Sequence, residues 1–195
     1  MDSSRRPHPA KETEVKLQVP SAEAARALLA RAGFVPLHDR AFEANSVFDT
    51  PARDLMNSSR LLRLRAFRGE AILTFKGAPE PGPHKVRPEF ETAASDPATL
   101  QLILESLGYE VLFRYEKYRT TLQREGDPGH AVLDETPIGT FLELEGPPDW
   151  IDSIAAQLGF SQSDYILLSY GSLYRQHCQA LGISPTHMVF AESDR

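Results

Sequence analysis

The chain has 195 residues, of which 41% are hydrophobic and 25% charged, and its formal net charge is -6. The length fits one domain, alone or with a tail, and the composition is typical of a soluble folded protein rather than a disordered one. The negative charge argues against sequence-independent binding to nucleic acid, which needs a cationic surface.

Cysteine content and hydropathy limit the chain further. Cys178 is the single cysteine, which excludes a disulfide framework or a cysteine-rich zinc site within one chain. No apolar run approaches the roughly 20 residues needed to span a bilayer, and Met1 to Ala10 lack the apolar region of a secretory signal. We therefore expect a cytoplasmic protein that binds neither membrane nor nucleic acid, with residues 1–10 as a flexible arm.

The first half of the chain reads mainly as strands. Alternation of apolar and polar residues predicts strands over 11–19, 41–49, 61–68, 71–77 and 85–91. A helix is predicted between the N-cap Ser21 and Gly33. A short turn follows Pro51, and residues 79–83 form a Pro/Gly-rich loop. Pro88 lies within a predicted strand, which indicates an edge strand or a bulge.

The second half adds three helices and three strands. Asp96 as N-cap and Pro97 as first helical residue predict a helix that ends at Gly108. Strands are predicted over 110–124, 131–135 and 140–146, and helices over 150–158 and 169–181. These elements form one predicted domain over residues 11–183, and we expect residues 184–195 to be a loosely ordered tail.

A unit of strand, helix and turn recurs along the chain. Each copy begins with two glutamates separated by one residue and ends with a helix followed by glycine and an aromatic residue. The copies are Glu12/Glu14 with Gly33-Phe34, Glu89/Glu91 with Gly108-Tyr109, and Glu143/Glu145 with Gly159-Phe160. About eight strands are predicted in all, enough to close a barrel with room for one small ligand.

Charged side chains share one face on most of these strands. Side chains alternate along a strand, so Glu12, Glu14 and Lys16 point the same way. Helices can cover the apolar opposite faces, which leaves the charged faces for the barrel interior. The expected interior cations are Lys16, Arg63, Arg65, Lys76, Lys85, Arg87, Lys117 and Arg119, and the anions are Glu12, Glu14, Glu89, Glu91, Asp134, Glu143 and Glu145.

Such an interior is costly unless its charges pair with one another or bind a ligand. Arginine and lysine clusters bind phosphate oxygens. Carboxylates without nearby histidine or cysteine suit a hard cation such as Mg²⁺ or Mn²⁺. The combination predicts a metal-polyphosphate ligand, and the alternative is an interior that is only salt-bridged.

Several short motifs follow one another along the chain and together resemble the CYTH superfamily, also called triphosphate tunnel metalloenzymes. The motifs are Glu12-x-Glu14-x-Lys16, residues 45–50, 62–65, 73–77, 87–91, 117–119, 133–135 and 141–145, and Ser169-Tyr170. The resemblance covers roughly residues 11–175. It implies an α+β fold in which an eight-stranded antiparallel closed barrel forms a tunnel and helices pack outside.

The resemblance also implies roles for the charged residues. Members of the superfamily include class IV adenylate cyclases, thiamine triphosphatases, inorganic triphosphatases and fungal-type RNA triphosphatases. By this likeness the triphosphate would be bound by Lys16, Arg63, Arg65, Lys76, Lys117 and Arg119, the metal by Glu12, Glu14, Asp134, Glu143 and Glu145, with Lys85, Arg87, Glu89 and Glu91 in support. Lys16, Glu12 and Glu14 are the candidates for a catalytic role.

Two positions depart from the superfamily pattern. Val47 stands where many members carry a tyrosine that supports the lysine of the first motif. The segment before Glu12 reads Pro7-His8-Pro9 and lacks the His-Phe pair of many class IV cyclases. We expect a metal-dependent hydrolase of a small inorganic or organic triphosphate, as a monomer or homodimer. The alternatives are a class IV adenylate cyclase and a non-catalytic polyphosphate-binding module.

Overall fold

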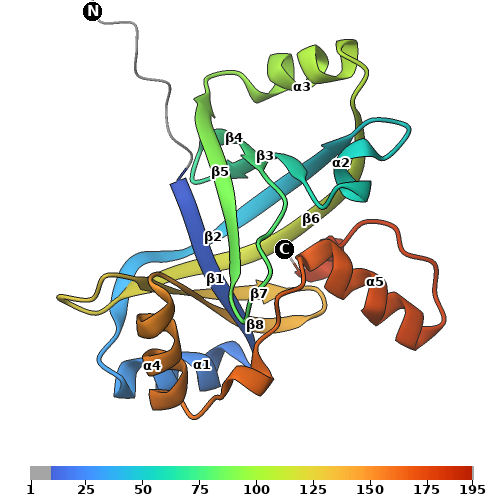
Figure 1. Cartoon of the computed structure of the whole chain (residues 1–195). Helices are drawn as coiled ribbons and strands as arrows, with labels where there is room; N and C mark the ends of the chain where they lie inside the picture. The colour runs from blue at the N-terminus through green and yellow to red at the C-terminus, as the bar shows by residue number, and fades with distance from the viewer. Residues whose placement is uncertain (1–9, 195) are drawn as a thin grey trace, which may run out of the picture.

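Eight strands close into one antiparallel barrel, in the spatial order β1-β5-β4-β3-β2-β6-β7-β8 (Figure 1). The structure is a computed structural model and describes residues 10–194. The strands are β1 Ala10–Val19, β2 Val35–Asp49, β3 Leu61–Phe67, β4 Glu70–Lys76, β5 Lys85–Ala94, β6 Glu110–Gln123, β7 His130–Thr136 and β8 Gly139–Glu145. The predicted eight-stranded closed barrel is therefore confirmed.

Helices pack around the outside of this barrel. They are α1 Ala22–Arg31, α2 Asp54–Asn57, α3 Pro97–Ser106, α4 Pro148–Gln157 and α5 Tyr170–Leu181, with short 3-10 turns η1 Gln162–Asp164 and η2 Glu192–Asp194. In Figure 1, α1 and α4 lie together, whereas α3 and α5 cover other sides. The predicted N-caps hold, because Ser21 accepts from the Ala24 N–H and Asp96 from the Thr99 N–H. Among the described residues, none of these helices is long and apolar enough to cross a membrane.

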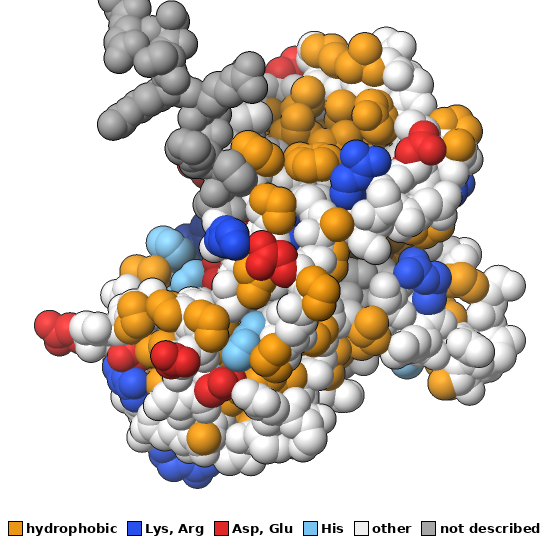
Figure 2. All heavy atoms as spheres, viewed as in Figure 1, with side chains coloured by type: hydrophobic (Ala, Val, Ile, Leu, Met, Phe, Trp, Pro, Cys, Tyr) orange, Lys and Arg blue, Asp and Glu red, His pale blue; other side chains and the backbone are white. Residues whose placement is uncertain are grey.

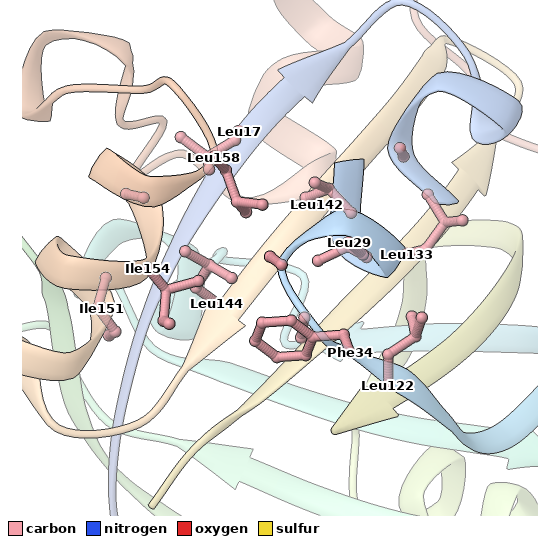
Figure 3. Packing of buried hydrophobic residues seen from close by; sticks show 14 of the residues in the cluster. Leu17, Leu29, Phe34, Leu122, Leu133, Leu142, Leu144, Ile151, Ile154 and Leu158 are labelled. Carbon is pink, nitrogen blue, oxygen red and sulfur yellow. The ribbon is translucent and has the colours of Figure 1, made fainter. Parts of the chain in front are cut away.

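The main hydrophobic core lies between the barrel wall and the pair α1 and α4 (Figure 3). Leu17, Leu142 and Leu133 are register neighbours on β1, β8 and β7, and all three are fully buried. Leu29 of α1 and Ile154 of α4 pack onto this apolar face. Since side chains alternate across a strand, covering the outer face in this way turns the charged face inward.

The recurring unit seen in the sequence has a common backbone structure at its turns. Gly33, Gly108 and Gly159 have φ between 87° and 89°. In each copy the N–H of the following aromatic residue bonds to the carbonyl five residues earlier, for example Phe34 to Leu29. This is a Schellman motif, in which glycine adopts the left-handed conformation at low cost.

Two strand predictions need correction. β2 begins at Val35 rather than at Ala41, because its first residues pair with the end of β6 across register shifts that break the alternation. Pro88 does not lie on an edge strand, since β5 pairs with both β1 and β4. The Pro88 carbonyl accepts from Gly77 (2.8 Å), just past the end of β4, so the missing proline N–H falls where that ladder has stopped.

The terminal predictions have different outcomes. The predicted arm over residues 1–10 lies outside the described residues except for Ala10, which begins β1. The C-terminal segment differs from the predicted loose tail, because Met188 is fully buried and exchanges backbone hydrogen bonds with β6 on both sides of Tyr115. Met188 packs in a cluster with Tyr115, Phe141 and Tyr170, which ties this segment to the barrel.

Candidate functional site

The charged faces of the strands line one cavity of about 1410 Å³ inside the barrel. Of the predicted site residues, the cavity wall contains Glu12, Glu14, Lys16, Arg63, Arg65, Lys76, Lys85, Arg87, Glu89, Glu91, Lys117, Arg119, Glu143 and Glu145. Asp134 is the exception, because it is fully buried beneath Lys117 and Arg119. On the outer face shown in Figure 2, lysine and arginine side chains are instead scattered singly among apolar and uncharged ones.

Buried arginines supply part of this wall without using all their hydrogen-bond donors. Arg63 donates to the hydroxyls of Tyr115 and Thr74, both at 3.3 Å. The Nε–H groups of Arg63, Arg65 and Arg87 are buried and have no hydrogen-bond partner within residues 10–194. An unpaired buried donor costs about 1–3 kcal/mol, and these Nε atoms are closed off from the cavity, so a ligand there would meet other atoms of the cationic side chains that line it.

Glu91 and Glu89, the predicted supporting carboxylates, lie against cationic side chains. Glu91 is 3.4 Å from Arg65 and 3.6 Å from Arg63, and it accepts from the Thr74 hydroxyl at 2.7 Å. Lys76 lies 3.0 Å from Glu89. These carboxylates fix the directions in which their cationic partners point.

Lys16 is buried on β1, between β5 and β8 in the barrel wall. Its ammonium is 2.8 Å from Glu143 and 4.6 Å from the centre of the Tyr170 ring. Burial alone would lower the pKa of Lys16, but the charges of Glu143 and Glu14 outweigh it and raise that pKa. Lys16 is therefore a fixed positive charge at neutral pH.

Asp134 joins several of these groups from beneath the cavity wall. Its carboxylate accepts from Lys117 at 2.8 Å, from Arg119 at 2.7 and 2.6 Å, and from the Tyr170 hydroxyl at 2.8 Å. Arg119 also bonds to Glu143 at 2.5 Å. With four hydrogen bonds already made, Asp134 orients cations in this structure rather than presenting free oxygens to the cavity.

Glu43 belongs to the same network and was missed from the sequence. It is fully buried on β2, 3.3 Å from Lys117, and accepts from the Asn45 amide at 3.0 Å. Burial would raise the pKa of Glu43, but the charges of Lys117 and Arg119 lower it to about 2. The available signal was its period-2 spacing from Asn45, which begins the motif over residues 45–50.

Carboxylates crowd together in another part of the cavity. Lys76 lies 2.5 Å from Glu12. Burial, with the hydrogen bond that protonated Glu89 donates to Glu12, raises the pKa of Glu89 to about 8. Burial, with the charges of Glu12 and Glu14, raises the pKa of Glu145 to about 7. Raised carboxyl pKa values mark a place where added positive charge is favourable.

Among the predicted metal ligands, Glu12, Glu14, Asp134 and Glu143 are engaged with lysine or arginine in this structure. Among the described residues, no three His, Cys, Asp or Glu side chains are arranged so that they could hold a metal ion. Glu12 binds Lys76, Glu14 binds Lys85, and Glu145 is 3.5 Å from His130. The all-oxygen donor set and the raised pKa of Glu145 fit Mg²⁺ or Mn²⁺. Such binding would require Glu12 and Glu14 to leave their lysines.

Comparison with known proteins agrees with the fold. The family model for the CYTH domain matches residues 10–160. A protein of Methanocaldococcus jannaschii, provisionally named an adenylate cyclase, is 27% identical over 134 residues, which are 69% of this chain and 75% of that protein.

Solved structures share the same architecture. An X-ray structure from Vibrio parahaemolyticus, provisionally described as an adenylate cyclase, has a TM-score of 0.73 and 23% identity, and the match covers 85% of this chain and 98% of that one. A protein from Hippeastrum, provisionally described as an adenylyl cyclase with a dominant triphosphatase activity, has a TM-score of 0.63 and 21% identity, covering 85% and 96%. At these identities the structures support the fold alone.

Proposed function

The chain belongs to the CYTH domain family, and on that premise we propose that it is a divalent-metal-dependent hydrolase of a small triphosphate. The single observation that carries the proposal is that one cavity is lined by cationic side chains from several strands, namely Lys16, Arg63, Arg65, Lys76, Lys85, Arg87, Lys117 and Arg119. A triphosphate chain supplies many charged acceptor oxygens in a narrow, extended shape. Charge-assisted hydrogen bonds to such oxygens are the strong kind.

In this proposal the cations of the barrel hold the phosphate chain and neutralise charge as it shifts in the transition state. Arg63 and Arg65 contact it from β3, Lys76 from β4, Lys16 from β1 and Arg119 from β6. These side chains are buried or nearly so and are already oriented by carboxylates. Arg63 and Arg65, held by Glu91, are thus preorganised, which saves reorganisation energy when the substrate reacts.

The carboxylates would hold the metal. Glu12, Glu14 and Glu145 are the nearest ligands to the crowded negative region, and Mg²⁺ or Mn²⁺ there would neutralise charge on the phosphate chain. Glu12 and Glu14 are also the candidates for orienting the attacking water. Glu43 and Asp134, fully buried, would serve Lys117 and Arg119 rather than the substrate.

A second candidate is adenylate cyclase, which the names of the Methanocaldococcus and Vibrio proteins favour. The same cavity would hold the triphosphate of ATP while the ribose 3′-oxygen attacks the α-phosphorus. The Hippeastrum protein, described as dominantly a triphosphatase, favours the hydrolase instead.

One panel of assays separates these functions. Tripolyphosphate, thiamine triphosphate and ATP are each incubated with Mg²⁺ or Mn²⁺, and phosphate, pyrophosphate and cyclic AMP are measured together. The hydrolase releases phosphate without cyclic AMP. If ATP gives cyclic AMP and pyrophosphate in equal amounts, the protein is an adenylate cyclase and not a hydrolase. Tight triphosphate binding without turnover would indicate a binding module.

A further inference from the structure

Tyr170, the first residue of α5, brings an aromatic ring into the charged interior of the barrel. Only 7% of the residue is exposed. Its ring centre lies 4.6 Å from the Lys16 ammonium and 5.0 Å from that of Lys117, within cation–π range. Its hydroxyl donates to Asp134 at 2.8 Å. One side chain therefore contacts two proposed phosphate-binding lysines and the carboxylate that orients a third cation, Arg119.

The segment that carries Tyr170 contacts Lys16 at two places, its backbone and its ammonium group. Ile166 forms an antiparallel bridge with Lys16, with its N–H bonded to the Lys16 carbonyl at 2.8 Å and its carbonyl accepting from the Lys16 N–H at 3.3 Å. Ser169 then caps α5 by accepting from the Ser172 N–H, which sets Tyr170 at the first helical position. The backbone of Lys16 is fixed by Ile166 and its ammonium by the Tyr170 ring.

The position of the ring is itself strongly determined. Tyr170 packs against Tyr115 at 6.0 Å and edge-on against Phe141 at 5.7 Å, and Met188 from the C-terminal segment completes the cluster. Val47 packs against the same cluster, and its small side chain leaves room for a ring that arrives from α5. Neither a rotamer change nor a shift of Tyr170 is available without disturbing several buried neighbours.

We propose that Tyr170 is a positioning residue of the triphosphate site, where its ring fixes Lys16 and Lys117 and its hydroxyl holds Asp134 against Arg119. The inference rests on the proposed function. A lysine ammonium sits on a flexible four-carbon stem, so an aromatic face narrows the directions it samples. Orientation of this kind acts on the transition state more than on ground-state binding. The helix α5, which lies outside the barrel wall, thereby becomes a working part of the site.

Two variants separate the ring from the hydroxyl. Tyr170→Phe keeps the ring over the lysines and removes the donor to Asp134. We expect kcat for tripolyphosphate hydrolysis to fall about ten-fold with KM changed less than about three-fold. Tyr170→Leu also removes the ring, and we expect a further fall of about ten-fold in kcat. Tyr174→Phe is the matched control, because Tyr174 lies one turn along α5 and, within residues 10–194, its hydroxyl contacts Thr186 alone, at 3.4 Å.

The outcomes are distinguishable when thermal midpoints are measured beside the kinetics. Wild-type kcat in Tyr170→Phe and Tyr170→Leu would overturn the inference while leaving the proposed function intact. A kcat loss shared equally by Tyr174→Phe would mean general loosening of α5 and would overturn it too. A wild-type protein that neither binds nor hydrolyses tripolyphosphate would instead overturn the proposed function, and this inference with it.

Discussion

Arg63 is largely buried, and its side chain lines the cavity of the barrel. If its guanidinium binds a phosphate oxygen there, the Arg63→Ala variant loses a charge-assisted contact that strengthens in the transition state. We expect kcat/KM for tripolyphosphate to fall about 10²–10³-fold. Initial-rate kinetics measure this, and Arg31→Ala, at the exposed end of α1, should retain the wild-type value. Equal rates in Arg63→Ala and wild type would remove Arg63 from the site.

Titration of Glu89 should make the free energy of unfolding of the metal-free protein depend on pH, and the direction follows from its raised pKa. Its pKa is raised to about 8 in the folded state, mainly by burial. The folded state therefore holds a proton that the unfolded state has released, and the stabilisation from that proton is lost as pH rises from about 4.5 to 8. Glu89→Gln cannot titrate. Its free energy of unfolding should thus improve relative to wild type between pH 5 and pH 8, by on the order of 1 kcal/mol after discounting for solvent screening.

The measurement is urea denaturation in chelator-treated buffer at several pH values. Glu91→Gln is the matched control on the same strand, because the Thr74 and Arg65 contacts outweigh burial and lower the pKa of Glu91. The difference in free energy of unfolding between Glu91→Gln and wild type should not change with pH above pH 5. A flat difference for Glu89→Gln as well would contradict the raised pKa.

The residue spacing predicts which side chains enter the tunnel, but not how they pair there. Alternation assigns Arg63 or Glu143 to a face, and the structure agrees. Alternation does not say which side chain on another strand each residue contacts, because strand order and register decide that. This is why Glu43 and the Tyr170–Asp134 contact escaped the sequence, and why Asp134 looked like a residue open to a ligand.

At the scale of elements, α4 packs closely on the β7–β8 hairpin. Trp150 of α4 lies against Gly129, just before β7, and Gly146, just after β8. A Cβ at Gly129 would lie 2.5 Å from the Glu145 carbonyl oxygen and 2.6 Å from the Trp150 ring. We expect Gly129→Ala to lower the free energy of unfolding by about 3 kcal/mol. Gly126→Ala in the same turn meets no atom within 4 Å but has φ +80°, so it should cost only about 1 kcal/mol. Chemical denaturation of both variants checks the difference, and equal losses would mean that the hairpin and α4 can separate freely.

Elements were predictable where local signals repeat. The N-caps Ser21 and Asp96, glycine stops and alternation locate α1, α3, β1 and β3 closely. The start of β2 and the C-terminal segment were not predictable, because their structure depends on pairing with distant parts of β6. Met188 illustrates this, since it lies in a short segment without periodicity and is buried only because β6 presents backbone groups to it.

For the whole molecule, the interior already balances its own charges. Lys16, Lys76 and Lys85 are each paired with a glutamate. A triphosphate that takes these lysines must displace the glutamates, which are then left with uncompensated charge in a partly buried place. A divalent cation relieves that cost. Triphosphate and metal should therefore bind with positive coupling, and by linkage each raises the affinity for the other equally.

Calorimetry with a non-hydrolysable imido analogue of tripolyphosphate tests this coupling. We expect the affinity to be at least about ten-fold tighter with Mg²⁺ than in chelator-treated buffer. Mg²⁺ also binds the analogue in free solution, so Glu145→Gln serves as the control. It removes a carboxylate from the crowded region, where the pKa of Glu145 is raised to about 7, and touches no described lysine or arginine ion pair. Its metal-free affinity should match wild type while the gain from Mg²⁺ shrinks. An identical gain in both proteins would place the coupling in the solution complex rather than in the tunnel.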